Sequence, residues 1–360
     1  MTRRPGRWLG TSRSAAAAAT ACLLLACGPT AGPRQPVSTT APAPLTAPAT
    51  NSTAQQPSTG SLQTVTLQLS WLKGGQFAGE FMAAENGYYS AAGLDVQFIP
   101  GGPSVNTVPV VASGTATIGI VGSAPLLTAR SQGIPLKAIG ATYDKAPSSL
   151  SCRPQANVTS VADLKGKTIG VSAPQRVNLE AMLRINNIDP SEVNINASGA
   201  DLTSLVAGRI DCRATNIYDE PISLREQGVD ASNLLYYDAG LKQQGDVLYV
   251  SEDTDRTQNA MLTRFLQATT RGWEYALANP DESGRTVVAK YAPDVDVGHT
   301  IAVIKALGSL VETDRTAKDG VLSLDPAVWN QTASLLTGVG LLPATFDATS
   351  AMDLSVYQKP

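Results

Sequence analysis

Cys27 is the residue whose chemistry is most clearly indicated by its neighbours. It closes the lipobox LLAC, residues 24–27, a sequence that directs acylation of the cysteine. Residues 1–26 carry four arginines and no acid, and their second half is almost entirely apolar. Such a segment is typical of a signal peptide and is shorter than the roughly 20 residues of a spanning helix. We expect cleavage before Cys27 and attachment of acyl chains, including palmitate, to this cysteine as a lipid anchor. The alternative is an uncleaved N-terminal anchor.

Few other residues could carry reactive chemistry. The only histidine of the sequence, His299, lies in a region expected to be helical, and we interpret it as a surface or capping residue. Cys22 would leave with the signal peptide, so that Cys152 and Cys212 remain. In an exported protein these two could form a disulfide, and two buried free thiols are the alternative. Neither belongs to a CxxC pair, and no metal-ligand spacing or Ser-His-Asp set is evident, so we expect no metal, no cofactor and no catalysis.

Composition divides the chain into a tether and a globular part. Residues 28–63 consist mainly of Pro, Thr, Ala, Ser and Gln, and cannot bury enough surface to fold, so we expect residues 27–63 to be a lipidated, semi-extended tether. The remaining roughly 300 residues are enough for two lobes. Removal of residues 1–26 takes four of the 27 basic residues and none of the 30 acidic ones, which leaves a formal charge of −7. This charge indicates no nucleic-acid partner.

Strands and helices alternate along the globular part. In the first half we expect strands at residues 65–71, 94–99, 117–121 and 136–143, with helices at 76–86, 105–113 and 124–132. A second series has strands at 168–171, 193–197 and 212–218, and helices at 176–185 and 201–207. Strands at 235–238 and 246–250 would return the chain to the first lobe, before a long helix over 256–278 and a mostly helical C-terminal third.

This alternation predicts an α/β fold with two doubly wound sheets. We expect lobe one to comprise residues 64–155 and 236–360, and lobe two to comprise residues 156–235. Two open α/β sheets that face one another form a cleft at the carboxyl ends of their strands.

A series of motifs runs through the globular part. They are Gln68-Leu69-Ser70-Trp71, Gln76-Phe77-Ala78-Gly79, AAENGYY at 83–89, Gly93-Leu94-Asp95-Val96, PGGP at 100–103, ADLKGK at 162–167 and WEYALANP at 273–280. Together they resemble the solute-binding proteins of ABC importers of the SsuA and thiamine-pyrimidine-binding type, over residues 64–342. The resemblance implies a two-lobe periplasmic-binding-protein fold of type II, a ligand in the interlobe cleft, and docking to an ABC permease with its ATPase.

The resemblance also implies which residues face the ligand. The candidates are Trp71, Gln76, Ser123 and Tyr143 in lobe one, and Gln175, Asn178, Tyr218, Asp219 and Glu220 in lobe two. Trp71, at the end of the first expected strand, could stack on a flat heterocycle or could instead be a core residue that caps the sheet. Tyr143 and Tyr218 could sandwich a ring between the lobes.

The polar candidates have alternatives of their own. Gln76 and Ser123 lie at loop-to-helix junctions, where side chains and helix amides can meet ligand carbonyls, although Ser123 could simply cap its helix. Asp219 and Glu220 could accept hydrogen bonds from a ring N–H, an amine or a hydroxyl, or could cap the helix that begins near Pro221.

Riboflavin is the expected ligand, because the motifs are most similar to the branch that binds aromatic vitamins and their precursors. Glycine-flanked loops beside Trp71 and Pro103 would allow a roomy cleft. The alternatives are an aminopyrimidine precursor of thiamine and an alkanesulfonate, the latter disfavoured because the cleft candidates are aromatic and acidic. A pyrimidine-synthesising enzyme of related fold needs a cysteine-rich motif and a reactive histidine, which this sequence lacks. We expect a monomer on the extracytoplasmic face of the cell membrane.

Overall fold

The computed structural model describes residues 61–199 and 201–359. Cys27, the signal peptide expected over residues 1–26 and almost all of the tether expected over 27–63 lie outside the described residues. The lipid anchor therefore stays a prediction from sequence.

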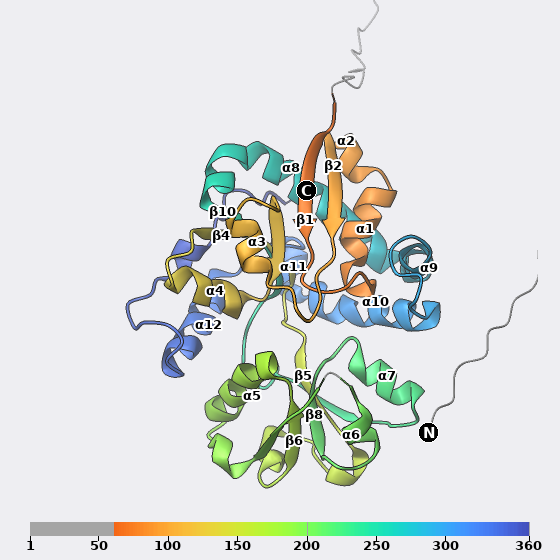
Figure 1. The fold of residues 1–360 in the computed structure, drawn as a ribbon, viewed down its shortest axis with the longest axis vertical. Helices are drawn as coiled ribbons and strands as arrows, with labels where there is room; N and C mark the ends of the chain where they lie inside the picture. Colours follow the sequence, from red (N-terminus) through yellow and green to blue (C-terminus); the bar gives the residue numbers. More distant parts are fainter. Residues whose placement is uncertain (1–60, 200, 360) are drawn as a thin grey trace, which may run out of the picture. The chain divides into compact units, whose positions relative to one another are not determined.

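The first sheet has, within the described residues, five strands in the order β2-β1-β3-β10-β4 (Figure 1). They are β1 (Gln63–Gln68), β2 (Leu94–Ile99), β3 (Ile118–Val121), β4 (Leu136–Tyr143) and β10 (Gly245–Ser251). β1 is parallel to β2 and β3, whereas β10 is antiparallel to β3 and β4. The carboxyl ends of β1, β3 and β4 therefore lie at the edge of the sheet where β10 begins.

The helices of lobe one come from both ends of the described chain (Figure 1). They are η1 (Gly75–Phe77), α1 (Ala78–Glu85), α2 (Tyr88–Ala91), α3 (Thr107–Ala112), α4 (Ser123–Ser131), α8 (Glu252–Ala278), α9 (Pro280–Lys290), α10 (Val297–Val311), α11 (Asp314–Asp319), α12 (Pro326–Gly338) and η5 (Ala348–Ala351). The helix expected over 76–86 is confirmed, and it ends as the glycine signal indicates: Gly87 has a left-handed φ of 70°. α8 starts at an N-cap, because the Ser251 hydroxyl accepts a hydrogen bond from the Thr254 amide at 3.1 Å.

Two apolar clusters pack in lobe one. One contains Leu67, Phe81 and Trp273, so that it joins β1, α1 and α8. The other contains Leu136 and Trp329, and includes residues of α4 and α12. Residues from both ends of the described chain thus share each cluster, which explains why lobe one is built from two separate stretches of sequence.

The second sheet also has five strands among the described residues, in the order β7-β6-β8-β5-β9. Its elements are β5 (Ser148–Cys152), η2 (Pro154–Ala156), η3 (Val161–Leu164), β6 (Thr168–Val171), α5 (Ala173–Ile185), η4 (Pro190–Glu192), β7 (Asn194–Ala197), α6 (Thr203–Val206), β8 (Cys212–Asn216), α7 (Glu220–Glu226) and β9 (Ser232–Leu235). β6 is parallel to β7 and β8, and β5 is antiparallel to β8 and β9. The expected two-sheet α/β architecture is confirmed.

The boundaries of lobe two differ from the expected residues 156–235. β5 belongs to the second sheet, so that this sheet begins at Ser148. Our sequence analysis missed β5 because its sequence SSLSC is mostly polar, yet it is buried: the Ser149 hydroxyl lies 2.9 Å from Thr215 Oγ1, and the Ser151 hydroxyl donates to Asn233 Oδ1 at 2.7 Å. The strand expected over 235–238 is wrong: it shares only Leu235 with β9, residues 236–238 form a turn, and β9 pairs with β5 rather than returning to lobe one.

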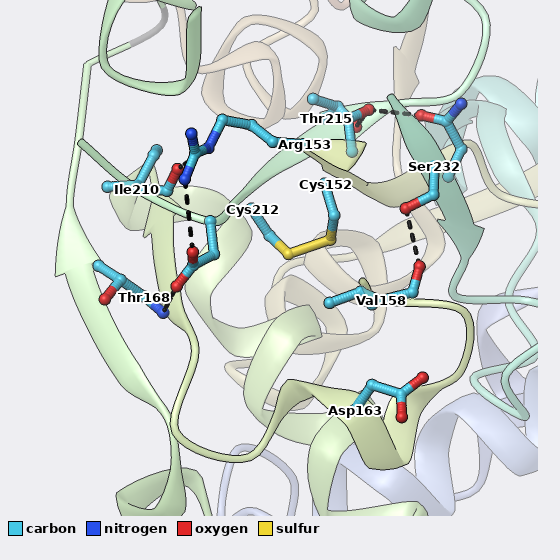
Figure 2. Close-up of a disulfide and its surroundings, with 12 residues drawn as sticks. Cys152, Arg153, Val158, Asp163, Thr168, Ile210, Cys212, Thr215 and Ser232 are labelled. Carbon is cyan, nitrogen blue, oxygen red and sulfur yellow. Dashed lines mark hydrogen bonds and ion pairs between the residues drawn. A yellow bond between two sulfur atoms is a disulfide. The ribbon is translucent and has the colours of Figure 1, made fainter. Parts of the chain in front are cut away.

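Cys152 of β5 and Cys212 of β8 are opposite each other in the second sheet and form a disulfide (Figure 2). Of the two alternatives left open by the sequence, the structure therefore has the disulfide. Beside it, the Ser232 hydroxyl of β9 donates a hydrogen bond to the Val158 carbonyl at 2.8 Å (Figure 2). The disulfide closes a loop of the chain that contains β6, α5 and β7. It therefore links the two ends of the α/β core of lobe two covalently.

Candidate functional site

The two sheets present their strand ends to each other. In lobe one, Ser70, Ser123 and Tyr143 lie at or just beyond the ends of β1, β3 and β4. In lobe two, Tyr218 follows the end of β8. The rings of Tyr143 and Tyr218 are 5.9 Å apart between centroids, so these edges meet. Open α/β folds bind ligands at such strand ends.

Trp71 lies on a loop, because β1 ends at Gln68 rather than at residue 71 as expected. Its side chain is 44% exposed, and the next residue, Leu72, is 54% exposed. Val105 on the loop after β2 and Val177 in the first half of α5 are also among the exposed large apolar residues. The alternative that Trp71 is a core residue capping the sheet is therefore wrong. Trp71 and Leu72 together give the loop after β1 an exposed apolar surface, and such surfaces are characteristic of binding sites.

Gly101 holds the Trp71 loop in place. Its amide donates a hydrogen bond to the Trp71 carbonyl at 2.9 Å. A Cβ at position 101 would come within 2.4 Å of the Leu69 carbonyl oxygen and 2.8 Å of the Trp71 nitrogen. Because both of these are backbone atoms, a side chain here would push the Trp71 loop away.

The two polar candidates of lobe one face different partners. The Gln76 side-chain amide donates to the Leu72 carbonyl at 3.3 Å, and the Gln76 carbonyl accepts a hydrogen bond from the Tyr143 hydroxyl at 2.9 Å. Ser123 is the first residue of α4, whose N-cap is Gly122, so the alternative role as a side-chain cap is not seen. Its hydroxyl is buried and has no hydrogen-bond partner in the described part of the chain.

Tyr143 and Tyr218 do not form the expected sandwich in this structure. Their rings are in contact at an interplanar angle of 56°, which leaves no space for a third ring between them. Both rings belong to the apolar cluster that contains Trp273, and burial raises the pKa of both hydroxyls. In the arrangement seen, the pair joins the two lobes.

Gln175 and Asn178 of α5 lie near serines at the edge of lobe two. Gln175 Oε1 accepts a hydrogen bond from the Ser172 hydroxyl at 2.6 Å, and Asn178 Nδ2 lies 3.5 Å from the Ser148 hydroxyl. Asn178 also borders a pocket of about 380 Å³ where α5 meets α3, α4 and α12. The structure thus brings these two residues to the strand ends of lobe two, but the pocket does not include the other candidates.

Asp219 and Glu220 take different roles, and neither is the expected side-chain cap. Glu220 Oε2 accepts a hydrogen bond from the Asn216 amide at 2.8 Å, and burial raises its pKa. Asp219 Oδ1 lies 2.9 Å from Nε2 of His299. His299 Nδ1 is 3.2 Å from Glu226 Oε1 at the other end of α7.

His299 is therefore an interlobe residue rather than a surface or capping residue. It lies in α10 of lobe one, and its side chain is 16% exposed between two carboxylates of lobe two. The hydrogen bond to Asp219 is the main reason that its pKa rises to about 9. Sequence alone could not reveal this, because the acids are more than seventy positions away.

Asp246 is a further candidate at these strand ends that the sequence analysis did not identify. It lies at the start of β10, opposite the end of β4, with a positive φ of 41°. The hydroxyls of Tyr143 and Ser70 face its carboxyl group, and burial raises its pKa to about 7. The only sequence signal was an acid at the start of an apolar strand, in Gly245-Asp246-Val247.

Within 61–199 and 201–359, no group of three or more His, Cys, Asp or Glu side chains could hold a metal ion. None of the helices in this part of the protein is both long and apolar enough to cross a bilayer.

The fold is that of the periplasmic binding proteins. The periplasmic aliphatic sulphonate binding protein SsuA of Escherichia coli superposes with a TM-score of 0.63 at 15% identity, over 81% of this chain and 97% of SsuA. Residues 75–283 match the family described as NMT1/THI5 like, and the chain belongs to this family.

Three relatives with assigned roles indicate the range of this family. The riboflavin-binding protein RibY of Chloroflexus aurantiacus is 30% identical over 87% of this chain and 90% of RibY. A formylaminopyrimidine-binding protein of Halalkalibacterium halodurans is 27% identical over 62% of this chain and 69% of its own. A 4-amino-5-hydroxymethyl-2-methylpyrimidine phosphate synthase of Legionella pneumophila is 22% identical over 61% of this chain and 71% of the synthase. Binding proteins and an enzyme thus both occur among the similar proteins.

Proposed function

We propose that this protein is an extracytoplasmic solute-binding lipoprotein of an ABC importer, and that it captures riboflavin between its lobes for delivery to the permease. The membrane anchor would be Cys27, supported by the lipobox and the signal-peptide character of residues 1–26. The similarity to RibY over most of both chains supports riboflavin as the ligand.

The observation that carries this proposal is the exposed apolar surface at the cleft edge. Trp71 and Leu72 lie side by side in sequence on the loop after β1, and Gly101 supports this loop through its backbone. An exposed indole offers a flat face on which an aromatic heterocycle can stack, and such stacking contributes about 0.5–1.5 kcal/mol beyond the burial of area. The polar groups of Gln76, Tyr143 and Asp246 lie near the same strand ends and could bind the ring edge.

An aminopyrimidine precursor of thiamine is the second candidate. The formylaminopyrimidine-binding relative supports it, and a pyrimidine would use the same combination of stacking and edge hydrogen bonds. The two ligands differ in size, so direct binding must decide between them.

Fluorescence titration of the mature protein with riboflavin tests the proposal. We expect flavin emission to be quenched with a dissociation constant of about 1 μM or tighter. Trp71→Ala should weaken binding roughly tenfold or more, because it removes both stacking and apolar contact. Leu354→Ala is the matched control, since Leu354 is as exposed as Leu72, at 54%, but lies in the C-terminal segment away from the strand ends.

The opposite result would be equally clear. If riboflavin leaves the fluorescence and the melting temperature unchanged while formylaminopyrimidine raises the melting temperature, the protein serves thiamine salvage. Equal losses in Trp71→Ala and Leu354→Ala would show that Trp71 is not part of the site.

A further inference from the structure

Asp246 is more exposed to solvent than its neighbours in the sequence. Gly245 and Val247 on either side of it are buried, whereas Asp246 is partly exposed. It begins β10, which places it at the same sheet edge as the ends of β1 and β4. An acidic residue at the strand ends of an α/β lobe is in the position where such folds contact ligands.

The groups around the Asp246 carboxyl come from several elements. The Ser70 hydroxyl follows β1, the Tyr143 hydroxyl ends β4, and Tyr218 reaches it from lobe two. Glu80 of α1 is the other acid close enough to influence it. No lysine, arginine or histidine nitrogen of residues 61–199 and 201–359 lies within ion-pairing distance of this carboxyl. Its negative charge therefore has hydroxyl partners but no cation in the described structure.

The backbone conformation of Asp246 is also consistent with a contact to a ligand. A φ of 41° is uncommon for a residue with a side chain, and the surrounding strand pairing holds it there. Such conformations are often found where a side chain must be aimed at a ligand. Ser70, which faces the carboxyl, directly precedes Trp71 in the sequence, so the carboxyl lies next to the base of the proposed stacking loop.

We propose that Asp246 binds the polar edge of the ring that stacks on Trp71, with its carboxylate accepting a hydrogen bond from a ring N–H. The inference rests on the proposed function, because it assigns a specificity-determining residue within that same cleft. It selects heterocycles with an N–H donor on the ring edge, such as the N3–H of the isoalloxazine ring of riboflavin.

The protonation state of Asp246 gives the proposal a measurable consequence. Burial raises its pKa to about 7, so that the free protein holds it partly protonated near neutral pH. Of the titratable groups that face it, Glu80 has a pKa of about 8, and Tyr143 and Tyr218 have pKa values raised well above 10. An ionised carboxylate accepts a hydrogen bond from a ring N–H more strongly than the neutral acid does, so riboflavin affinity should fall from pH 8 to pH 6, by up to about tenfold.

The test uses two ligands and two variants of the mature protein. Riboflavin and 3-methylriboflavin differ in the ring N–H alone, and both are followed by flavin fluorescence. Asp246→Gly deletes the acceptor, and Asp246→Asn keeps its shape without the charge; Gly and Asn both adopt positive φ readily, and circular dichroism checks their folding. Asp255→Asn is the matched control, since burial also raises the pKa of Asp255, to about 6, but Asp255 lies in α8 beyond the far end of β10.

We expect the natural protein to bind 3-methylriboflavin roughly ten- to one-hundredfold more weakly than riboflavin. Asp246→Gly should bind both flavins alike, with riboflavin affinity reduced by that same factor. Asp246→Asn should lose the pH dependence of binding, and Asp255→Asn should retain it.

Two results would overturn the inference alone: discrimination against 3-methylriboflavin that persists in Asp246→Gly, or a pH dependence that persists in Asp246→Asn. In both, riboflavin still binds and the proposed function stands. If the natural protein binds neither flavin, the proposed function fails and the assignment of Asp246 fails with it.

Discussion

At the scale of single residues, Glu80 shows how burial in the core of lobe one changes the pKa of an acid. Its side chain is buried, and Oε1 accepts a hydrogen bond from Trp273 Nε1 at 3.2 Å. Oε2 and the nearby Thr142 hydroxyl have no hydrogen-bond partner that meets normal geometry in the described structure. Desolvation raises the pKa of Glu80 to about 8, which favours a neutral acid at neutral pH.

This shift predicts that Glu80 makes the fold less stable as the pH rises. The folded state holds a proton that the unfolded state releases near pH 4.5, so the free energy of unfolding should fall between about pH 4.5 and 8 and then level off. Glu80→Gln cannot ionise, and its amide can still accept from Trp273 and donate to Thr142. We expect it to be more stable than the natural protein by about 2–4 kcal/mol at pH 8.5, with little difference at pH 4.5.

Urea unfolding at several pH values measures this difference. Asp253→Asn, at an acid whose side chain is 76% exposed, is the control and should leave the pH profile unchanged. A Glu80→Gln variant whose stability runs parallel to that of the natural protein from pH 4.5 to 8.5 would contradict the prediction.

At the scale of elements, α1 and α8 approach each other through glycine. A Cβ on Gly272 of α8 would come within 2.1 Å of the Gly79 carbonyl oxygen and 2.7 Å of the Ala83 Cβ. A Cβ on Gly79 would lie 2.2 Å from the Trp273 ring. Because α1 follows the Trp71 loop and η1, this helix contact also supports the cleft edge.

We predict that Gly272→Ala lowers the free energy of unfolding by about 1–3 kcal/mol, because the two backbones must separate. Gly308 provides a matched control: it also lies inside a helix, α10, but a Cβ there would meet no atom within 4 Å. Gly308→Ala should therefore raise stability by about 0.5–1 kcal/mol through helix propensity. Urea unfolding distinguishes the two, and effects of the same sign would refute the packing argument.

At the scale of the whole molecule, His299 ties α10 of lobe one to α7 of lobe two. Its ring nitrogens face Asp219 and Glu226, while its backbone amide donates to its own N-cap, Asp296, at 2.8 Å. The folded pKa of about 9 lies above the ordinary value of 6.5. The stabilising contribution is therefore complete below pH 6.5 and is lost as the pH rises through 9.

Replacement of His299 should reveal this dependence on pH. We expect His299→Gln to reduce stability by about 1 kcal/mol at pH 6–7, since the contact is partly screened by solvent, and to have almost no effect at pH 10. Thermal unfolding at these pH values measures the loss. Adding Glu226→Gln to His299→Gln should cost less than the two single changes together, and full additivity would show that the two side chains do not interact.

The sequence by itself determined the alternation of strands and helices and the class of fold, and it located most of the strands. Strands such as 94–99, 136–143 and 168–171 match β2, β4 and β6, because short apolar runs bounded by Gly, Pro or polar residues are local signals. It also placed Trp71, Tyr143 and Tyr218 near strand ends that face each other, since the ends of parallel strands share one edge.

Only the tertiary structure decided which of these residues meet. β5 was missed because its serines are polar, and they can be buried only because their hydroxyls form hydrogen bonds with β8 and β9. No local sequence pattern shows such partners. Asp246 and Ser70 lie far apart in sequence, and strand pairing alone brings them together. His299 of lobe one likewise contacts Asp219 and Glu226 of lobe two only because the two lobes pack together. Contacts between distant segments depend on the packing of the whole chain, whereas periodicity and turn signals extend over only a few residues.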